Sequence, residues 1–123
     1  MVEEIKGKTT KLLSDVDLDL DNSAYGHMCY TPAGNTMLFE FASQAVAQER
    51  LGSDAATDVL NICLDTPRYI AETYGPESIE YEDMLYRLDK DLIWFLDAIF
   101  EHVEDSSRVV IVLSSDHGTS PSY

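Results

Sequence analysis

An aspartate and a histidine stand next to each other near the end of the sequence, in the run Asp116-His117-Gly118. Neighbouring residues of an extended chain point to opposite sides, so these side chains converge only where the backbone turns, which Gly118 permits. Together they offer one oxygen and one nitrogen atom, and zinc accepts both as ligands. The same two residues would also serve as a hydrogen-bonded pair that caps a strand, and the dipeptide alone leaves both interpretations open.

The apolar residues before this pair predict a buried strand. Residues 109–113 form an unbroken and mostly β-branched run, which is typical of a central parallel strand covered on both faces. Residues 59–64 form a second short apolar stretch, and Asp65-Thr66 follows it in the same way. Parallel neighbouring strands end at one edge of a sheet, where ligands bind, so we expect the two polar clusters to meet there.

A long helix is predicted between the two strands. From about residue 78 to residue 103, apolar side chains recur at helical spacing, with Tyr81, Leu88 and Phe95 among them. Strand, helix and strand in this order imply a right-handed βαβ crossover. The predicted fold class is therefore α/β, with a mostly parallel sheet and flanking helices. Another helix is expected after a turn at residues 31–35.

The N-terminal part of the sequence has a different pattern. Between Asp15 and Asp21, aspartates alternate with apolar residues at period two, which predicts an edge strand or an extended arm with one wet face. We therefore divide the sequence into an acidic N-terminal arm or edge segment, residues 1–30, and an α/β fragment, residues 31–123.

The charge balance excludes some classes of partner. The sequence has 8 Lys+Arg and 23 Asp+Glu, a formal net charge of −15, and 45% of its residues are hydrophobic, enough for a folded core. Nucleic-acid binding needs clustered basic residues, so binding through a basic face is excluded. The charge also disfavours an anionic membrane surface, and no apolar window of about 18 residues predicts a membrane span.

The sequence resembles the alkaline phosphatase superfamily in several segments and in their order along the chain. The resemblance is closest to the phosphate-irrepressible alkaline phosphatase and nucleotide pyrophosphatase/phosphodiesterase branch. The resemblance covers roughly residues 30–123 and rests on Thr31-Pro32-Ala33-Gly34-Asn35 before a helix, Gly75-Pro76-Glu77-Ser78, Tyr81-Glu82-Asp83, Arg87-Leu88-Asp89-Lys90-Asp91-Leu92, and the strand that ends in Ser114-Ser115-Asp116-His117-Gly118. It implies part of an alkaline-phosphatase-like three-layer fold. It also implies zinc as the cofactor and a phosphate ester as the substrate, hydrolysed through a Thr or Ser nucleophile.

The resemblance implies that Asp116 and His117 are zinc ligands. It places the nucleophile outside this chain, so no catalytic residue is expected within it. We therefore expect a fragment of a longer, periplasmic or extracytoplasmic hydrolase. The fragment alone should be inactive, and its truncated sheet should tend to self-associate.

The second metal position of the family is altered in this sequence. The family carries an Asp and, four residues later, a His before the Gly-Pro turn, and alignment on Gly75-Pro76 places Arg68 and Glu72 there. Arg68 cannot ligate zinc; it could hold phosphate with its planar fork or form a surface ion pair. Glu72 is a further candidate oxygen ligand, as is Asp65, which lies three residues out of register.

Three functions remain open from the sequence. The first is a fragment of a metal-dependent phosphatase or phosphodiesterase. The second is a degenerate pseudoenzyme or binding module of the same fold, which the residues at positions 68 and 72 suggest. The third is a stand-alone small acidic protein that binds a basic partner.

Overall fold

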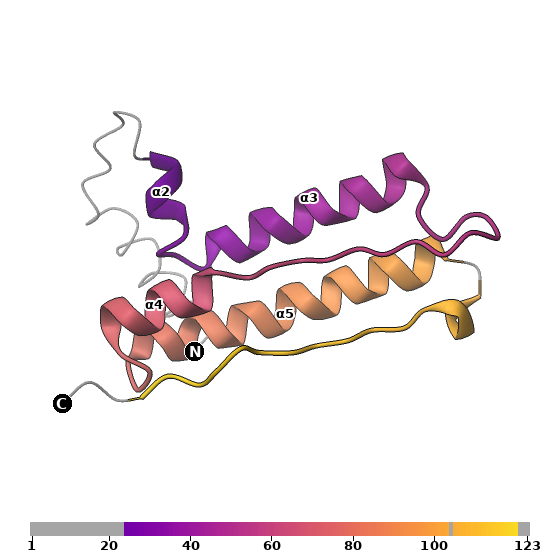
Figure 1. The fold of residues 1–123 in the computed structure, drawn as a ribbon. Coiled ribbons are helices and arrows are strands. Elements are labelled where there is room, and N and C mark those ends of the chain that lie inside the picture. Colours follow the sequence, from indigo (N-terminus) through magenta and orange to yellow (C-terminus); the bar gives the residue numbers. More distant parts are fainter. Residues whose placement is uncertain (1–23, 104, 121–123) are drawn as a thin grey trace.

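The computed structural model describes residues 24–103 and 105–120, and within them every regular element is helical. In order along the chain, the elements are α2 (Ala24–Met28), α3 (Ala33–Glu49), α4 (Thr66–Tyr74), α5 (Ile79–His102) and the 3₁₀ turn η1 (Ser106–Arg108). α3 and α5 pack against each other and run in the same direction, and α4 packs against α5 (Figure 1). None of the described helices has both the length and the apolar content that a bilayer crossing requires.

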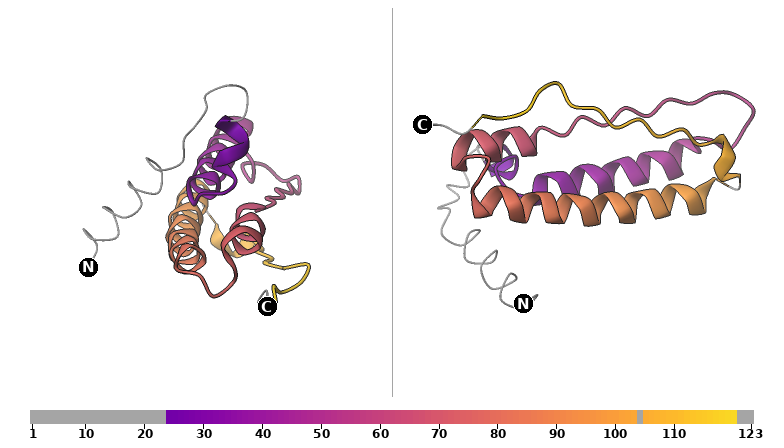
Figure 2. Two further views of the ribbon diagram at one scale, coloured as in Figure 1. Left: turned by 90° about the vertical axis from the view of Figure 1, so that its left-hand side faces the viewer. Right: turned by 90° about the horizontal axis from the view of Figure 1, so that it is seen from below.

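The predicted α/β class is wrong for this part of the chain, because neither the parallel sheet nor the βαβ crossover is present in it. Residues 57–64 and 110–115 are extended, run in the same direction, and lie on one side of the layer formed by α3 and α5 (Figure 2). No backbone hydrogen bond joins either segment to the other or to another described segment. β-branched residues favour an extended backbone, but a strand exists only when a neighbour pairs with it.

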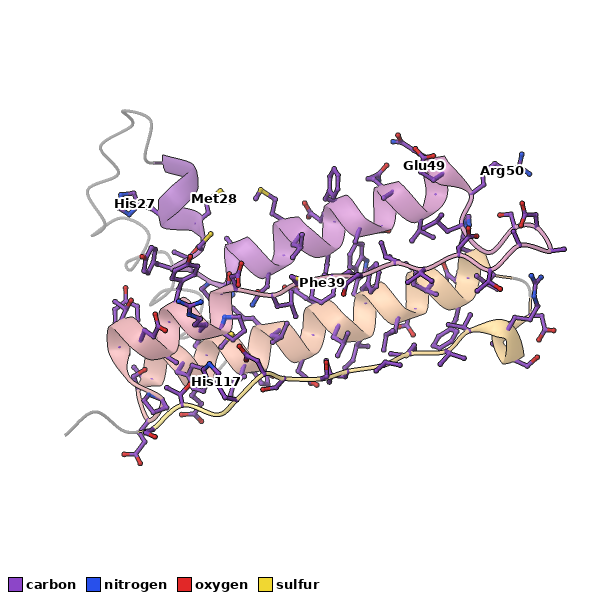
Figure 3. All side chains as sticks on the ribbon, viewed as in Figure 1. His27, Met28, Phe39, Glu49, Arg50 and His117 are labelled. Carbon is purple, nitrogen blue, oxygen red and sulfur yellow. The ribbon has the colours of Figure 1, made fainter. Side chains whose placement is uncertain are left out.

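The core lies between α3 and α5. Phe39 and Ala42 of α3 and Phe95 of α5 are buried, and the two phenyl rings pack at 5.2 Å between centroids (Figure 3). The α5 prediction is confirmed nearly to the residue. The Ser78 side chain accepts a hydrogen bond from the backbone N–H of Tyr81 and so caps the first turn.

The extended segments leave much of their apolar surface uncovered. In the first segment Ile62 and Leu64 pack on the helical core, whereas Val59, which points the other way in the period-two pattern, is 87% exposed. In the C-terminal segment neither face is covered, since the neighbouring residues Val112 and Leu113 are 83% and 78% exposed. The outer face expected to be buried in a sheet is therefore open to solvent.

The sequence prediction missed α4. Pro67 predicts a chain break, but it stands in the first turn of this helix, where its missing N–H costs no hydrogen bond. Ile70 and Ala71 of α4 are buried, and α4 packs against α5, whose Met84 is also fully buried. This packing turns a short polar segment into a stable helix.

Most of the predicted arm, residues 1–30, lies outside the described residues. Its described end contains α2, which is helical and not an edge strand. The turn expected at residues 31–35 is present only in its first part, since α3 already begins at Ala33.

Candidate metal and phosphate site

The two polar clusters predicted from the sequence lie at the same end of the molecule. Both extended segments run toward α4, and Asp65 stands at the N-cap position of this helix (Figure 1). Arg68 and Glu72 lie on α4, while Asp116 and His117 follow the second extended segment, with His117 at the α4 end (Figure 3). The shared direction of the two segments brings both clusters to this end, although no sheet joins the segments in the described part of the chain.

Asp116 and His117 interact with each other and with the local backbone. His117 Nε2 lies 3.5 Å from Asp116 Oδ2, and the backbone N–H of His117 donates to Asp116 Oδ1 at 3.0 Å. The other ring nitrogen, Nδ1, lies 3.0 Å from the carbonyl oxygen of Gly118. The side chains are 67% (His117) and 84% (Asp116) exposed, so solvent weakens the interaction between them. The two residues thus form a local hydrogen-bonded pair on an exposed extended segment, with no strand among the described residues for them to cap.

Arg68 and Glu72 form an ion pair along α4. Arg68 Nε donates to Glu72 Oε1 at 2.9 Å, and the side chains are 59% and 54% exposed. The hydrogen bond to Glu72, and then the charge of that carboxylate, raise the pKa of Arg68. The Arg68 guanidinium also lies over the ring of Tyr69, 5.8 Å from its centroid. Both side chains of the altered metal position are therefore engaged with each other.

The described residues do not form a complete metal site. A catalytic zinc ion takes three protein ligands, with water or substrate in the fourth position. Within residues 24–103 and 105–120, no group of three or more His, Cys, Asp and Glu side chains comes close enough together to hold a metal ion. Asp116 and His117 supply two ligand atoms, and neither Asp65 nor Glu72 joins them in such a group.

A buried polar junction near the start of α3 was not predicted. Asn35 is 2% exposed, and its Nδ2 has no hydrogen-bond partner among the described residues; Thr66, at the start of α4, is 4% exposed. Thr36 Oγ1 donates to Asp91 Oδ2 of α5 at 2.7 Å. The helical spacing of Asn35 with Phe39 and Ala42 is the signal that could have placed Asn35 on the buried face.

Gly34 explains why this junction can close. A Cβ atom at position 34 would lie 2.7 Å from Thr66 Oγ1 and 2.8 Å from the carbonyl oxygen of Met28. Such distances are too short for any side chain, so only glycine allows the start of α3 to approach α4 this closely. The segment Thr31–Asn35, which carries part of the family resemblance, is therefore a packing element in this structure.

Comparison with known proteins gives the family of the chain. A sequence model of type I phosphodiesterase / nucleotide pyrophosphatase matches residues 14–123. Alkaline phosphatase PhoV of Synechococcus elongatus is 34% identical over 115 residues, and alkaline phosphatase PafA of Elizabethkingia meningoseptica is 36% identical over 116 residues. Each alignment covers 94% of this chain.

Alkaline phosphatase PhoK of a Sphingomonas species is 33% identical over 98 residues, which are 80% of this chain and 17% of that protein. The chain spans about a fifth of PhoV and PafA, 21% of each. No solved structure matches it significantly. Because the family model covers almost the whole sequence, the chain belongs to the type I phosphodiesterase / nucleotide pyrophosphatase family.

Proposed function

We propose that this chain is part of a metal-dependent hydrolase of phosphoric esters. The observation that carries the proposal is the family match over residues 14–123, together with similarity to alkaline phosphatases over nearly the whole chain. Since the chain spans about a fifth of those relatives, the nucleophile and further metal ligands would come from outside it.

Asp116 and His117 are the residues that would hold a metal ion. Their exposed oxygen and nitrogen atoms fit zinc chemically, although two ligands alone bind it weakly. A bound zinc ion would activate the nucleophile and stabilise charge on the transferring phosphoryl group. Asp116 must be ionised and His117 neutral to bind a metal, so metal affinity should fall as the pH drops.

Arg68 is the proposed phosphate contact. Among the described residues Glu72 engages the Nε of Arg68, which leaves the two Nη groups to donate hydrogen bonds to two oxygens of a phosphate group. The formal charge of −15 means that the surface of the chain on its own would repel a phosphate ester. A bound metal and a fixed guanidinium are the positive charges that could offset this repulsion.

Hydrolysis of p-nitrophenyl phosphate and bis(p-nitrophenyl) phosphate tests the proposal. A protein that carries this chain within the full length of its relatives should turn over one of them, and Asp116→Ala should lower kcat/KM by about 100-fold or more. Asp97→Ala, which removes an exposed carboxylate of α5, is the matched control. The 123-residue chain alone should show no turnover.

A pseudoenzyme is the second candidate, and the Arg68–Glu72 ion pair is the observation that favours it. The same assay separates the two. A full-length protein without phosphoesterase activity, in which Asp116→Ala changes nothing, would rule out the hydrolase and leave a binding module of the same family.

A further inference from the structure

The family resemblance implies metal ligands at positions 68 and 72. In the structure these positions hold an arginine and a glutamate that pair with each other. We propose that α4 carries an arginine–glutamate ion pair in place of metal ligands, so that metal ions bind this chain without α4. The expectation that a metal ion binds at all rests on the proposed function. Whether residues of α4 take part in metal binding is a property of the chain itself. It can therefore be tested apart from any hydrolysis.

The contact between the two side chains carries the first step. Arg68 Nε and Glu72 Oε1 lie 2.9 Å apart, one helical turn from each other on α4. A metal ion could bind Glu72 only through its other oxygen, Oε2, or after this charge-assisted hydrogen bond is broken. In either case the Arg68 guanidinium would stay within one helical turn, where its positive charge would repel the divalent ion. The charge of Glu72 is therefore already balanced by Arg68 on the same helix.

The surroundings of the ion pair carry the second step. The Arg68 guanidinium lies over the Tyr69 ring, which adds a contact that holds it on this part of α4. Asp65, one turn before Arg68, has no cap hydrogen bond from its side chain and is exposed. Because a helix places residues three or four apart on one face, Asp65, Arg68 and Glu72 form a charged row with the cation at its centre.

The arrangement of Asp116 and His117 carries the third step. These two residues pair with each other and with the backbone next to them. No third His, Cys, Asp or Glu side chain joins them among the described residues, so the carboxylates of α4 do not complete their site. The Asp116–His117 pair and the Arg68–Glu72 pair therefore lie at the same end of the molecule without forming one metal site.

Zinc binding by the full 123-residue chain tests the proposal, by isothermal titration calorimetry and by metal analysis after equilibrium dialysis. Glu72→Gln should change the zinc affinity by less than about twofold, whereas Asp116→Asn should weaken it by about tenfold. The matched control is Asp83→Asn, which breaks the other i,i+4 pair with arginine, Asp83–Arg87 at 2.8 Å on α5. Circular dichroism of each variant confirms that the helices are retained.

A converse variant keeps the test decisive. Arg68→Asp/Glu72→His restores the ligand types of the family pattern, and we expect it to bind additional zinc. This gain supports the proposal whether or not the unaltered chain binds zinc measurably. Loss of affinity by more than about fivefold in Glu72→Gln but not in Asp83→Asn would make Glu72 a ligand and overturn the proposal. Neither outcome depends on phosphoesterase activity, so failure of the proposed function remains distinguishable.

Discussion

The identity of a single residue, Gly34, decides how closely the start of α3 approaches the start of α4. At the start of α3, Gly34 lies against Thr66 Oγ1 and the carbonyl oxygen of Met28, both closer than a Cβ atom tolerates. Alanine is the better helix former, so propensity alone favours alanine at this position. The close approach of α3 to the start of α4 reverses that preference.

Replacement of Gly34 by alanine should therefore destabilise the chain by about 1–3 kcal/mol, because an added methyl group in a tightly packed contact forces the backbone apart. Urea unfolding followed by circular dichroism measures the change. Gly26→Ala is the matched control, since a Cβ at this position in α2 meets nothing within 4 Å. Equal effects of the two substitutions would show that the contact at Gly34 contributes no constraint.

Helix boundaries belong to the scale of the element, and here the apolar spacing was accurate for the longest helix. It predicts a start at about residue 78, and α5 begins at Ile79 with Ser78 as its N-cap residue. α4 was missed because Pro67 was interpreted as a break, although proline is also a common first-turn residue. Only the burial of Ile70 and Ala71 against α5 distinguishes the two outcomes.

The capping contact of α5 gives a second prediction. Ser78→Ala removes the acceptor for the Tyr81 N–H, 3.2 Å away, and should lower the free energy of unfolding by about 1 kcal/mol. Ser78→Asp keeps an acceptor at the same position and should restore most of the loss. Thermal unfolding of both variants measures this difference. An alanine variant as stable as the aspartate variant would contradict the assigned role of the cap.

At the scale of the whole molecule, the dominant feature is an uncovered apolar surface. Val110, Val112 and Leu113 are 85%, 83% and 78% exposed, and the backbone groups of this segment make no hydrogen bond to another described segment. An extended apolar segment with free backbone groups is a template for pairing with another chain. Residues 109–115 carry no charged side chain, so no charge within this segment repels a second copy.

We therefore expect the chain to self-associate through residues 109–113. Val110→Glu/Val112→Glu should shift the chain toward monomer in sedimentation velocity, because it places charge on the surface that pairs. Gln44→Glu/Gln48→Glu adds the same charge to exposed positions of α3 and should have a much smaller effect. A chain that is monomeric at every concentration, or an equal response to both variants, would contradict this expectation.

The family and the candidate ligands followed from the sequence, because they depend on residue types in a fixed order. Asp116 and His117 are recognisable without coordinates, and the family comparison confirms the resemblance that their segment supported. Arg68 and Glu72 are recognisable as departures from the pattern of that family. The α5 helix also followed, since its apolar stripe is a local signal. These features depend only on residue types and their spacing along the sequence.

The tertiary structure alone decided the pairing of Arg68 with Glu72, the burial of Asn35 and Thr66, and the absence of a sheet among the described residues. Residues 59–64 and 109–113 have the composition of strands, and their β-branched side chains do extend the backbone. A strand, however, is a property of two hydrogen-bonded segments, and no segment within residues 24–103 and 105–120 pairs with either one. Composition sets the local conformation, whereas the presence of a partner decides whether a sheet forms.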